Sequence, residues 1–198
     1  IQAGNEAIKA RDLVETSLWC LTEPRKGRRA VLLPSGAELD AGERREPPSG
    51  PIGGYLYEPD PAVINPFFNL PELMHVVEKT EVDTRRLDDL PEIKSFDLLK
   101  IDVQGAEVDV MRGAERLLKS ACVVQTEINF VPMYKGMALF ADVDVEMRRQ
   151  GYMIHYLTHA MGRPFRPVAL NNDVNQNIRQ ILWGDAVYIR DFRTLGDL

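Results

Sequence analysis

The chain has 198 residues, 44% of them hydrophobic, which suffices for a buried core without disulfides or a structural metal. Its 30 acidic and 24 basic residues give a net charge of -6, which argues against a broad surface for nucleic acid or anionic membrane. No stretch approaches the roughly 20 apolar residues of a membrane span, and no basic leader with an apolar region opens the chain. We therefore expect a globular, cytoplasmic protein with neither a membrane nor a nucleic-acid partner.

The first 54 residues are expected to form a small β-rich segment. Two apolar, partly alternating runs within residues 12–33 flank the polar turn TEPRKG, which is typical of a β-hairpin. Residues 34–54 are rich in proline, glycine and mixed charge, and they predict a linker. The sequence therefore divides into residues 1–54 and a main domain at residues 55–198.

The main domain is expected to begin with short helical turns and a buried strand. Residues 61–77 favour short helices that Pro66 and Pro71 interrupt, because proline cannot continue a helix interior. Residues 96–103 form a nearly continuous apolar run, which is typical of a strand covered on both faces.

The rest of the main domain alternates between helical and strand patterns. Residues 106–119 predict a helix, because apolar residues recur at spacings of three and four. The residues of this apolar face are Val110, Met111, Ala114, Leu117 and Leu118. Residues 121–130 predict a second strand and residues 140–150 a second helix, and residues 152–158 and 181–190 predict two more strands. The last of these is amphipathic and expected near the end of the sheet, and the order indicates an α/β fold.

The cysteines and histidines predict no disulfide and no metal site. Cys20 and Cys122 lie far apart in apolar contexts, which indicates two reduced core thiols. His75, His155 and His159 are too scattered for a metal motif, and structural or surface positions are their expected roles. His155 is retained as an alternative base.

Two charges at the end of the run 96–103 mark a candidate site. Ligands of open α/β sheets bind at the carboxyl ends of the strands, where Asp102 lies, and strand alternation places Lys100 on the same face. Gly105 permits a tight turn after the strand, and Glu107 falls in the first turn of the predicted helix, where a carboxylate is favoured. The alternative is a structural strand-to-helix turn with a local ion pair.

Glu127 is expected at the same edge, because it lies near the end of the strand at residues 121–130. Two carboxylates such as Asp102 and Glu127 can orient a hydroxyl, act as a general base or hold a divalent cation. The alternative role for Glu127 is a helix or loop cap.

Three stretches, with the signature LKIDVQGAE inside the first, resemble the carboxyl-terminal half of the FkbM-type S-adenosylmethionine-dependent methyltransferases. They are residues 83–114, 123–152 and 182–192, and the resemblance runs from about residue 55 to 192. It implies a Rossmann-like methyltransferase sheet and methyl transfer to oxygen, commonly on sugars, polyketides or other small metabolites. Gln104 departs from the family, whose members usually carry Glu at this position.

The resemblance also implies roles for the candidate residues. Asp102 and Glu127, with Lys100 beside them, are expected to line the reaction crevice and to position or deprotonate the acceptor hydroxyl. Glu58 and Glu107 are the candidates for binding the S-adenosylmethionine cofactor. Such a fold needs an early strand and a Gly-rich turn for the donor, which the sequence does not contain. We therefore expect the sheet to be incomplete in its amino-terminal half.

Residues 1–64 resemble a different unit, the THUMP-like carboxyl-terminal domain that follows a methyltransferase domain in some actinobacterial proteins. This resemblance would make residues 24–29 an RNA contact, although a solvated hairpin turn is the expected role of their basic side chains.

The sequence thus predicts an S-adenosylmethionine-dependent methyltransferase that methylates oxygen on a small hydroxylated metabolite or sugar. The alternative is a non-catalytic methyltransferase-like module without the donor-binding turn, which would act through a partner or as a homo-oligomer.

Overall fold

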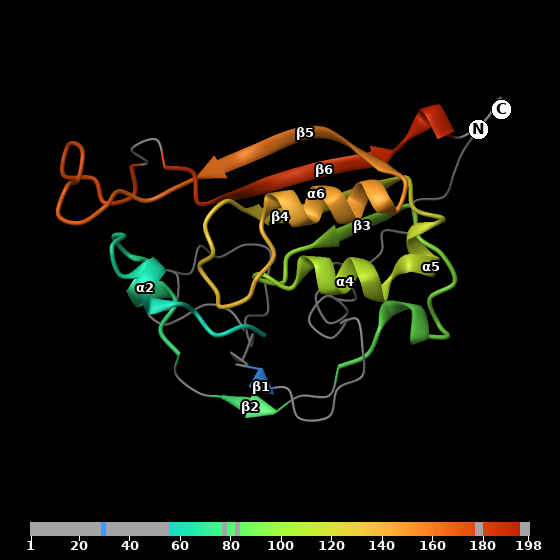
Figure 1. Cartoon of the computed structure of the whole chain (residues 1–198), viewed down its shortest axis with the longest axis horizontal. Helices are drawn as coiled ribbons and strands as arrows, with labels where there is room; N and C mark the ends of the chain where they lie inside the picture. The colour runs from blue at the N-terminus through green and yellow to red at the C-terminus, as the bar shows by residue number, and fades with distance from the viewer. Residues whose placement is uncertain (1–28, 31–55, 77–78, 82–83, 177–179, 195–198) are drawn as a thin grey trace, which may run out of the picture.

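The computed structural model describes residues 29–30, 56–76, 79–81, 84–176 and 180–194 (Figure 1). The predicted hairpin and linker lie outside these residues, except for strand β1 (Arg29–Ala30). This short strand pairs antiparallel with β2 (Thr80–Glu81), so the amino-terminal segment contacts the main domain here.

A mixed sheet of four strands forms the centre of the described structure, which confirms the α/β class. The strands are β3 (Leu98–Ile101), β4 (Val123–Asn129), β5 (Tyr152–Met161) and β6 (Trp183–Arg190). Their order is β3-β4-β6-β5, with β3 and β4 parallel and the other pairs antiparallel. The last strand in sequence, β6, was expected near the end of the sheet, but it lies between β4 and β5. Its consecutive buried residues Ala186, Val187 and Tyr188 fit this inner place.

Strand β3 differs from its prediction, because it is not covered on both faces. Leu98 is 57% exposed and Lys100 is also exposed, whereas Ile101 is buried. Within the described residues β3 is an end strand that pairs with β4 alone. The apolar run therefore reflects one covered face, and the charge at position 100 lies on the other.

Helices α4 (Glu107–Gly113) and α6 (Phe140–Arg149) lie side by side over the sheet (Figure 1). The predicted helix at residues 106–119 is divided at Ala114 into α4 and α5 (Glu115–Leu118). All five predicted apolar-face residues are at most 4% exposed, so that face is confirmed.

The short helix α5 has its own cap. Asp88 of the 3-10 helix η1 (Leu87–Asp89) accepts the backbone N–H groups of Arg116 at 2.7 Å and Leu117 at 3.0 Å. These carboxylate contacts satisfy N–H groups that a helix start leaves without an intrahelical partner.

Two short helices, α2 (Pro61–Ile64) and α3 (Leu70–Leu73), confirm the predicted helical turns. Pro71 lies in the first turn of α3, so it begins this helix rather than interrupting it. The segment packs against the connection between β5 and β6 through the rings of Phe67 and Phe165, whose centroids are 4.4 Å apart. A last 3-10 helix, η2 (Phe192–Thr194), follows β6.

The expectation of a core thiol is wrong for Cys122, which is free and exposed. Cys122 precedes β4, where its backbone N–H donates to Asp97 and its carbonyl accepts from Arg190, so the backbone is paired while the side chain faces outward. Cys20 lies outside the described residues. In the part of the chain that the structure describes, no helix is long and apolar enough to cross a membrane.

Candidate active site

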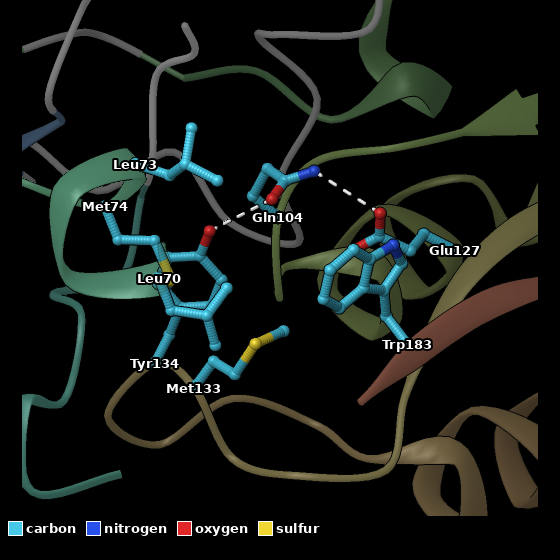
Figure 2. Close-up of a pocket in the computed structure, with 8 residues that line it drawn as sticks. All are labelled: Leu70, Leu73, Met74, Gln104, Glu127, Met133, Tyr134 and Trp183. Atoms are coloured by element: carbon cyan, nitrogen blue, oxygen red, sulfur yellow. Dashed lines mark hydrogen bonds between the residues drawn. The ribbon is translucent and has the colours of Figure 1, made fainter. Parts of the chain in front are cut away.

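The carboxyl ends of β3 and β4 bring together the three residues predicted to be catalytic. Gln104 connects two of them, because its Nε2 donates to Asp102 Oδ1 at 3.0 Å and to Glu127 Oε2 at 3.5 Å. Figure 2 shows the contact with Glu127. Lys100 Nζ lies 3.3 Å from Asp102 Oδ2, at the exposed rim of the cluster. The predicted proximity of Asp102 and Glu127 is therefore confirmed.

The turn between β3 and α4 has an unusual backbone. Gln104 has φ +55° and Gly105 has φ +101°, so two successive residues are left-handed. A Cβ at Gly105 would lie 3.1 Å from the Cβ of Met137 and 3.3 Å from the ring of Tyr134. Glycine is therefore required at position 105 both by the backbone and by the space around it.

Glu107 stabilises this turn from inside. Its side chain is buried, and its Oε1 accepts the N–H groups of Val103 at 3.2 Å and Gly105 at 3.1 Å. Burial raises the pKa of Glu107 above its usual value, although these backbone hydrogen bonds act in the opposite direction.

The partly buried Glu127 is surrounded by other carboxylates. Burial, followed by the negative charges of Asp102, Glu107 and Asp185, raises the pKa of Glu127 to about 8. Asn129 Nδ2 donates to Glu127 Oε1 at 3.3 Å, which favours the charged form. At neutral pH Glu127 is therefore mostly a neutral acid that can exchange its proton close to the physiological range.

A pocket of about 230 Å³ opens onto Gln104 and Glu127 (Figure 2). Its other walls come from α3 and the residue after it, from the connection between β4 and α6, and from the start of β6. These lining residues are Leu70, Leu73, Met74, Met133, Tyr134 and Trp183. The pocket is thus apolar along its length and polar at one end, where a hydroxyl group could be oriented against Glu127.

The sequence prediction missed Gln104, Tyr134 and Trp183 as site residues. Trp183 begins β6, and an antiparallel strand begins at the edge where its neighbour β4 ends, so the strand order would have placed it here. Tyr134 follows β4 closely, and its hydroxyl donates to Gln104 Oε1 at 3.0 Å. The residues from α3 carry no sequence signal for this position.

The other residues predicted for the site are Glu58 and the histidines, and none of them lines the pocket in the part of the chain that the structure describes. The exposed Glu58 pairs with Lys79 at 3.3 Å and Lys135 at 3.4 Å, and the hydrogen bond from Lys79 is the main cause that lowers its pKa. His75 and His155 are exposed, and the side chain of His159 is outside the described residues.

Both candidates for donor binding make contacts within the chain. Glu107 caps the turn from inside, and Glu58 forms two lysine pairs. The space at Gly105, where a backbone could approach a ligand, is filled by Met137 and Tyr134. The roles of Glu58 and Glu107 in donor binding stay a prediction. The described residues contain no group of three or more His, Cys, Asp or Glu side chains that could hold a metal ion.

Comparisons with known proteins agree on one class. The model of the methyltransferase FkbM domain matches residues 43–154, which is more than half of the chain. The chain is 44% identical over 48 residues to Methyltransferase 1 of Beauveria bassiana, covering 22% of this chain and 19% of that protein. It is 41% identical over 58 residues to the 2-O-methyltransferase NoeI of Sinorhizobium fredii, covering 28% of this chain and 24% of that protein.

The matched parts thus span only about a fifth and a quarter of these relatives' own lengths. No solved structure matches the chain. The family match begins at residue 43, ahead of the boundary predicted after residue 54, and residues 43–55 of it lie outside the described structure. The THUMP-like interpretation of residues 1–64 stays a prediction.

Proposed function

The chain belongs to the FkbM methyltransferase family, and from this membership we propose that it is an S-adenosylmethionine-dependent methyltransferase that methylates oxygen on a small hydroxylated metabolite or sugar. The printed name of the Sinorhizobium relative, a 2-O-methyltransferase, supports oxygen as the acceptor atom. The parallel pair β3 and β4, with α4 and α5 between them in sequence, supports the Rossmann-like part of the proposal.

One observation carries this proposal: Glu127 lies beside Asp102 at the polar end of an otherwise apolar pocket. S-adenosylmethionine supplies an electrophilic methyl group when it is bound. In the transfer the S–CH₃ bond would break with its electron pair kept by sulfur, so that S-adenosylhomocysteine leaves, and the acceptor's hydroxyl oxygen would gain the methyl group and lose its proton. Glu127 in its charged form takes this proton onto a carboxylate oxygen, and Asp102 adds negative charge that makes the proton easier to accept.

Positioning is expected to contribute most of the rate, because the donor is already reactive. The apolar walls of the pocket exclude water from the hydroxyl, and the amide of Gln104 defines the polar end against which it lies. Lys100, at the exposed rim, is expected to hold the Asp102 side chain in place through their ion pair at 3.3 Å.

Transfer of a radiolabelled methyl group from S-adenosylmethionine to methyl glucoside, octyl glucoside or catechol tests the proposal. Glu127→Gln is expected to lower the transfer rate by about 10²–10⁴-fold, which is typical for loss of a general base. Glu92→Gln makes the same chemical change at an exposed position and serves as the matched control. Equal rates in wild type and Glu127→Gln would refute the role of Glu127.

The second candidate function is a non-catalytic methyltransferase-like module that acts through a partner or as an oligomer. It is favoured by the finding that Glu58 and Glu107 are both engaged within the chain, and by the place of β3 at the end of the described sheet. Calorimetry with millimolar S-adenosylmethionine and light scattering separate the two candidates. An oligomer that binds no donor and transfers no methyl group would favour the module.

A further inference from the structure

Gln104 holds a conformation that its backbone alone would not favour. With φ +55° it lies in the left-handed region, which a non-glycine residue rarely adopts. Such a residue persists where its surroundings determine it, and these positions concentrate at functional sites. The surroundings here are the three hydrogen bonds of the Gln104 amide, to Asp102, Glu127 and Tyr134.

The orientation of this amide follows from its partners. Its NH₂ group donates to Asp102 Oδ1 at 3.0 Å and to Glu127 Oε2 at 3.5 Å, and both of these oxygens can accept a hydrogen bond. Its oxygen faces the hydroxyl of Tyr134, which donates to it at 3.0 Å. Tyr134 is 2% exposed, and its backbone forms a β-bridge with Pro59. The side-chain amide of Gln104 therefore binds to a tyrosine whose own position is fixed.

The side chain of Gln104 is a neutral amide among several carboxyl groups that surround Glu127. Asp102, after β3, and Glu107, the first residue of α4, both act on Glu127, and Asp185 lies directly opposite it on β6. On its own strand Asn129 donates to its other oxygen. Gln104 is thus the second amide donor to Glu127, and it adds no charge to a site that already contains four carboxylates.

We propose that Gln104 is a positioning residue, whose amide holds the Glu127 carboxylate against Asp102 in the orientation in which it receives the acceptor's proton. The proposal rests on the proposed function for the identity of that proton. The Gln104 side chain also connects Tyr134 to Glu127, because the Tyr134 hydroxyl donates to the same amide that donates to Glu127.

The experiment is a carbon-13 NMR titration of the Glu127 carboxyl group in the full chain, with its resonance assigned by its absence in Glu127→Gln. Gln104→Leu removes the donor, and Gln104→Glu replaces it with a further carboxylate of similar size. Both changes disfavour the charged form, so the titration midpoint of Glu127 is expected to rise by about one pH unit, and by more in Gln104→Glu. Tyr134→Phe is expected to give a smaller rise in the same direction.

Two matched controls separate the local effect from general ones. Gln176→Glu introduces the same net charge change at an exposed position, and Tyr57→Phe removes a hydroxyl that donates to Asp109 instead. Both are expected to leave the midpoint of Glu127 unchanged. If a Gln104 variant does not fold, as judged by thermal melting, Tyr134→Phe carries the test.

A midpoint that is the same in wild type and all folded variants overturns the proposal. A shifted midpoint, accompanied by an equal shift in the pH profile of kcat/KM for methyl transfer to octyl glucoside, supports it. If the midpoint shifts in the variants but the wild type transfers no methyl group, the result supports the positioning of Glu127 by Gln104. The same result overturns the proposed function. The two failures are therefore distinguishable, because the titration needs no catalysis.

Discussion

Glu127 and Glu146 are two glutamates removed from solvent in the same domain, and their neighbours give them opposite tendencies to ionise. At Glu146, which is 4% exposed, burial acts to raise the pKa, but hydrogen bonds from Arg149 and Gln150 outweigh it and lower the pKa. At Glu127 the neighbours are carboxylates, so burial and charge act together and raise the pKa to about 8. Burial alone therefore does not decide the charge of a carboxyl group.

The difference separates a structural region from a functional one. Arg149 Nη2 lies 2.6 Å from Glu146 Oε1 and Arg112 Nε lies 3.4 Å from Oε2, so Glu146 connects α6 to α4 as a stable anion. No comparable cation lies among the described partners of Glu127. A group left in such an unfavourable setting beside a pocket is typical of an active site, because stability alone would not favour it.

The largest effect on stability is expected from Gly105→Ala, which disturbs the turn that places Asp102 beside Glu127. The new Cβ is strained by φ +101° and meets Met137 at 3.1 Å, so we expect a loss of about 2–4 kcal/mol in the free energy of unfolding. Urea denaturation measures it. Gly136→Ala is the matched control, because Gly136 also has a positive φ but no atom within 4 Å of its Cβ position. Equal losses in both variants would mean that Met137 adds nothing to the effect.

Glu146→Gln is expected to lose about 1–3 kcal/mol of stability, because it removes the anion that Arg149 and Arg112 share. The loss is at the lower end for a buried pair, since both arginine side chains are at least half exposed and can regain water. Methyl transfer should be unchanged, in contrast to Glu127→Gln. A strong loss of transfer in folded Glu146→Gln would break the distinction between the two regions.

The elements around both glutamates could be predicted from sequence because their signals are local. The apolar spacing at residues 106–119 recurs over several helical turns, and the apolar run at residues 121–130 extends over a whole strand. The structure has helices α4 and α5 in the first range and strand β4 in the second. The meeting of Asp102 and Glu127 followed from one further rule, that neighbouring parallel strands end at the same edge.

What the sequence did not predict depends on contacts between distant segments. The exposed face of β3 and the inner place of β6 both follow from the strand order, which no local pattern encodes. Leu70 and Trp183 meet in one pocket although more than a hundred residues separate them. The bridging role of Gln104 depends on a left-handed backbone, and a residue name in a motif does not state a backbone conformation.

The pH dependence of stability should also separate the two glutamates. Because the pKa of Glu127 is raised, the folded chain binds a proton that the unfolded chain releases, so this group's contribution to stability falls as pH rises from about 4.5 to about 8. The pKa of Glu146 is lowered, so its contribution is present above about 4.5 and is lost as pH falls through its folded value.

Urea denaturation between about pH 3 and about pH 9 tests these signs. Glu127→Gln should become progressively more stable than wild type as pH rises, and one pKa unit corresponds to about 1.4 kcal/mol. The deficit of Glu146→Gln should instead shrink toward acid pH. Parallel curves for wild type and Glu127→Gln would show that the folded state does not hold the proton on Glu127.

The smallest effect is expected at Lys100, which was predicted to be catalytic and lies at the exposed rim of the site. The Lys100 and Asp102 side chains are 54% and 44% exposed, and such pairs contribute about 0–1 kcal/mol to stability. Lys100→Ala should therefore change the free energy of unfolding as little as Lys119→Ala, an exposed lysine elsewhere on the domain. Its transfer rate should fall only a few-fold, through a less well placed Asp102, and raised salt should reduce the difference. A loss of transfer as large as that of Glu127→Gln would instead place the Lys100 ammonium group in contact with the reacting atoms.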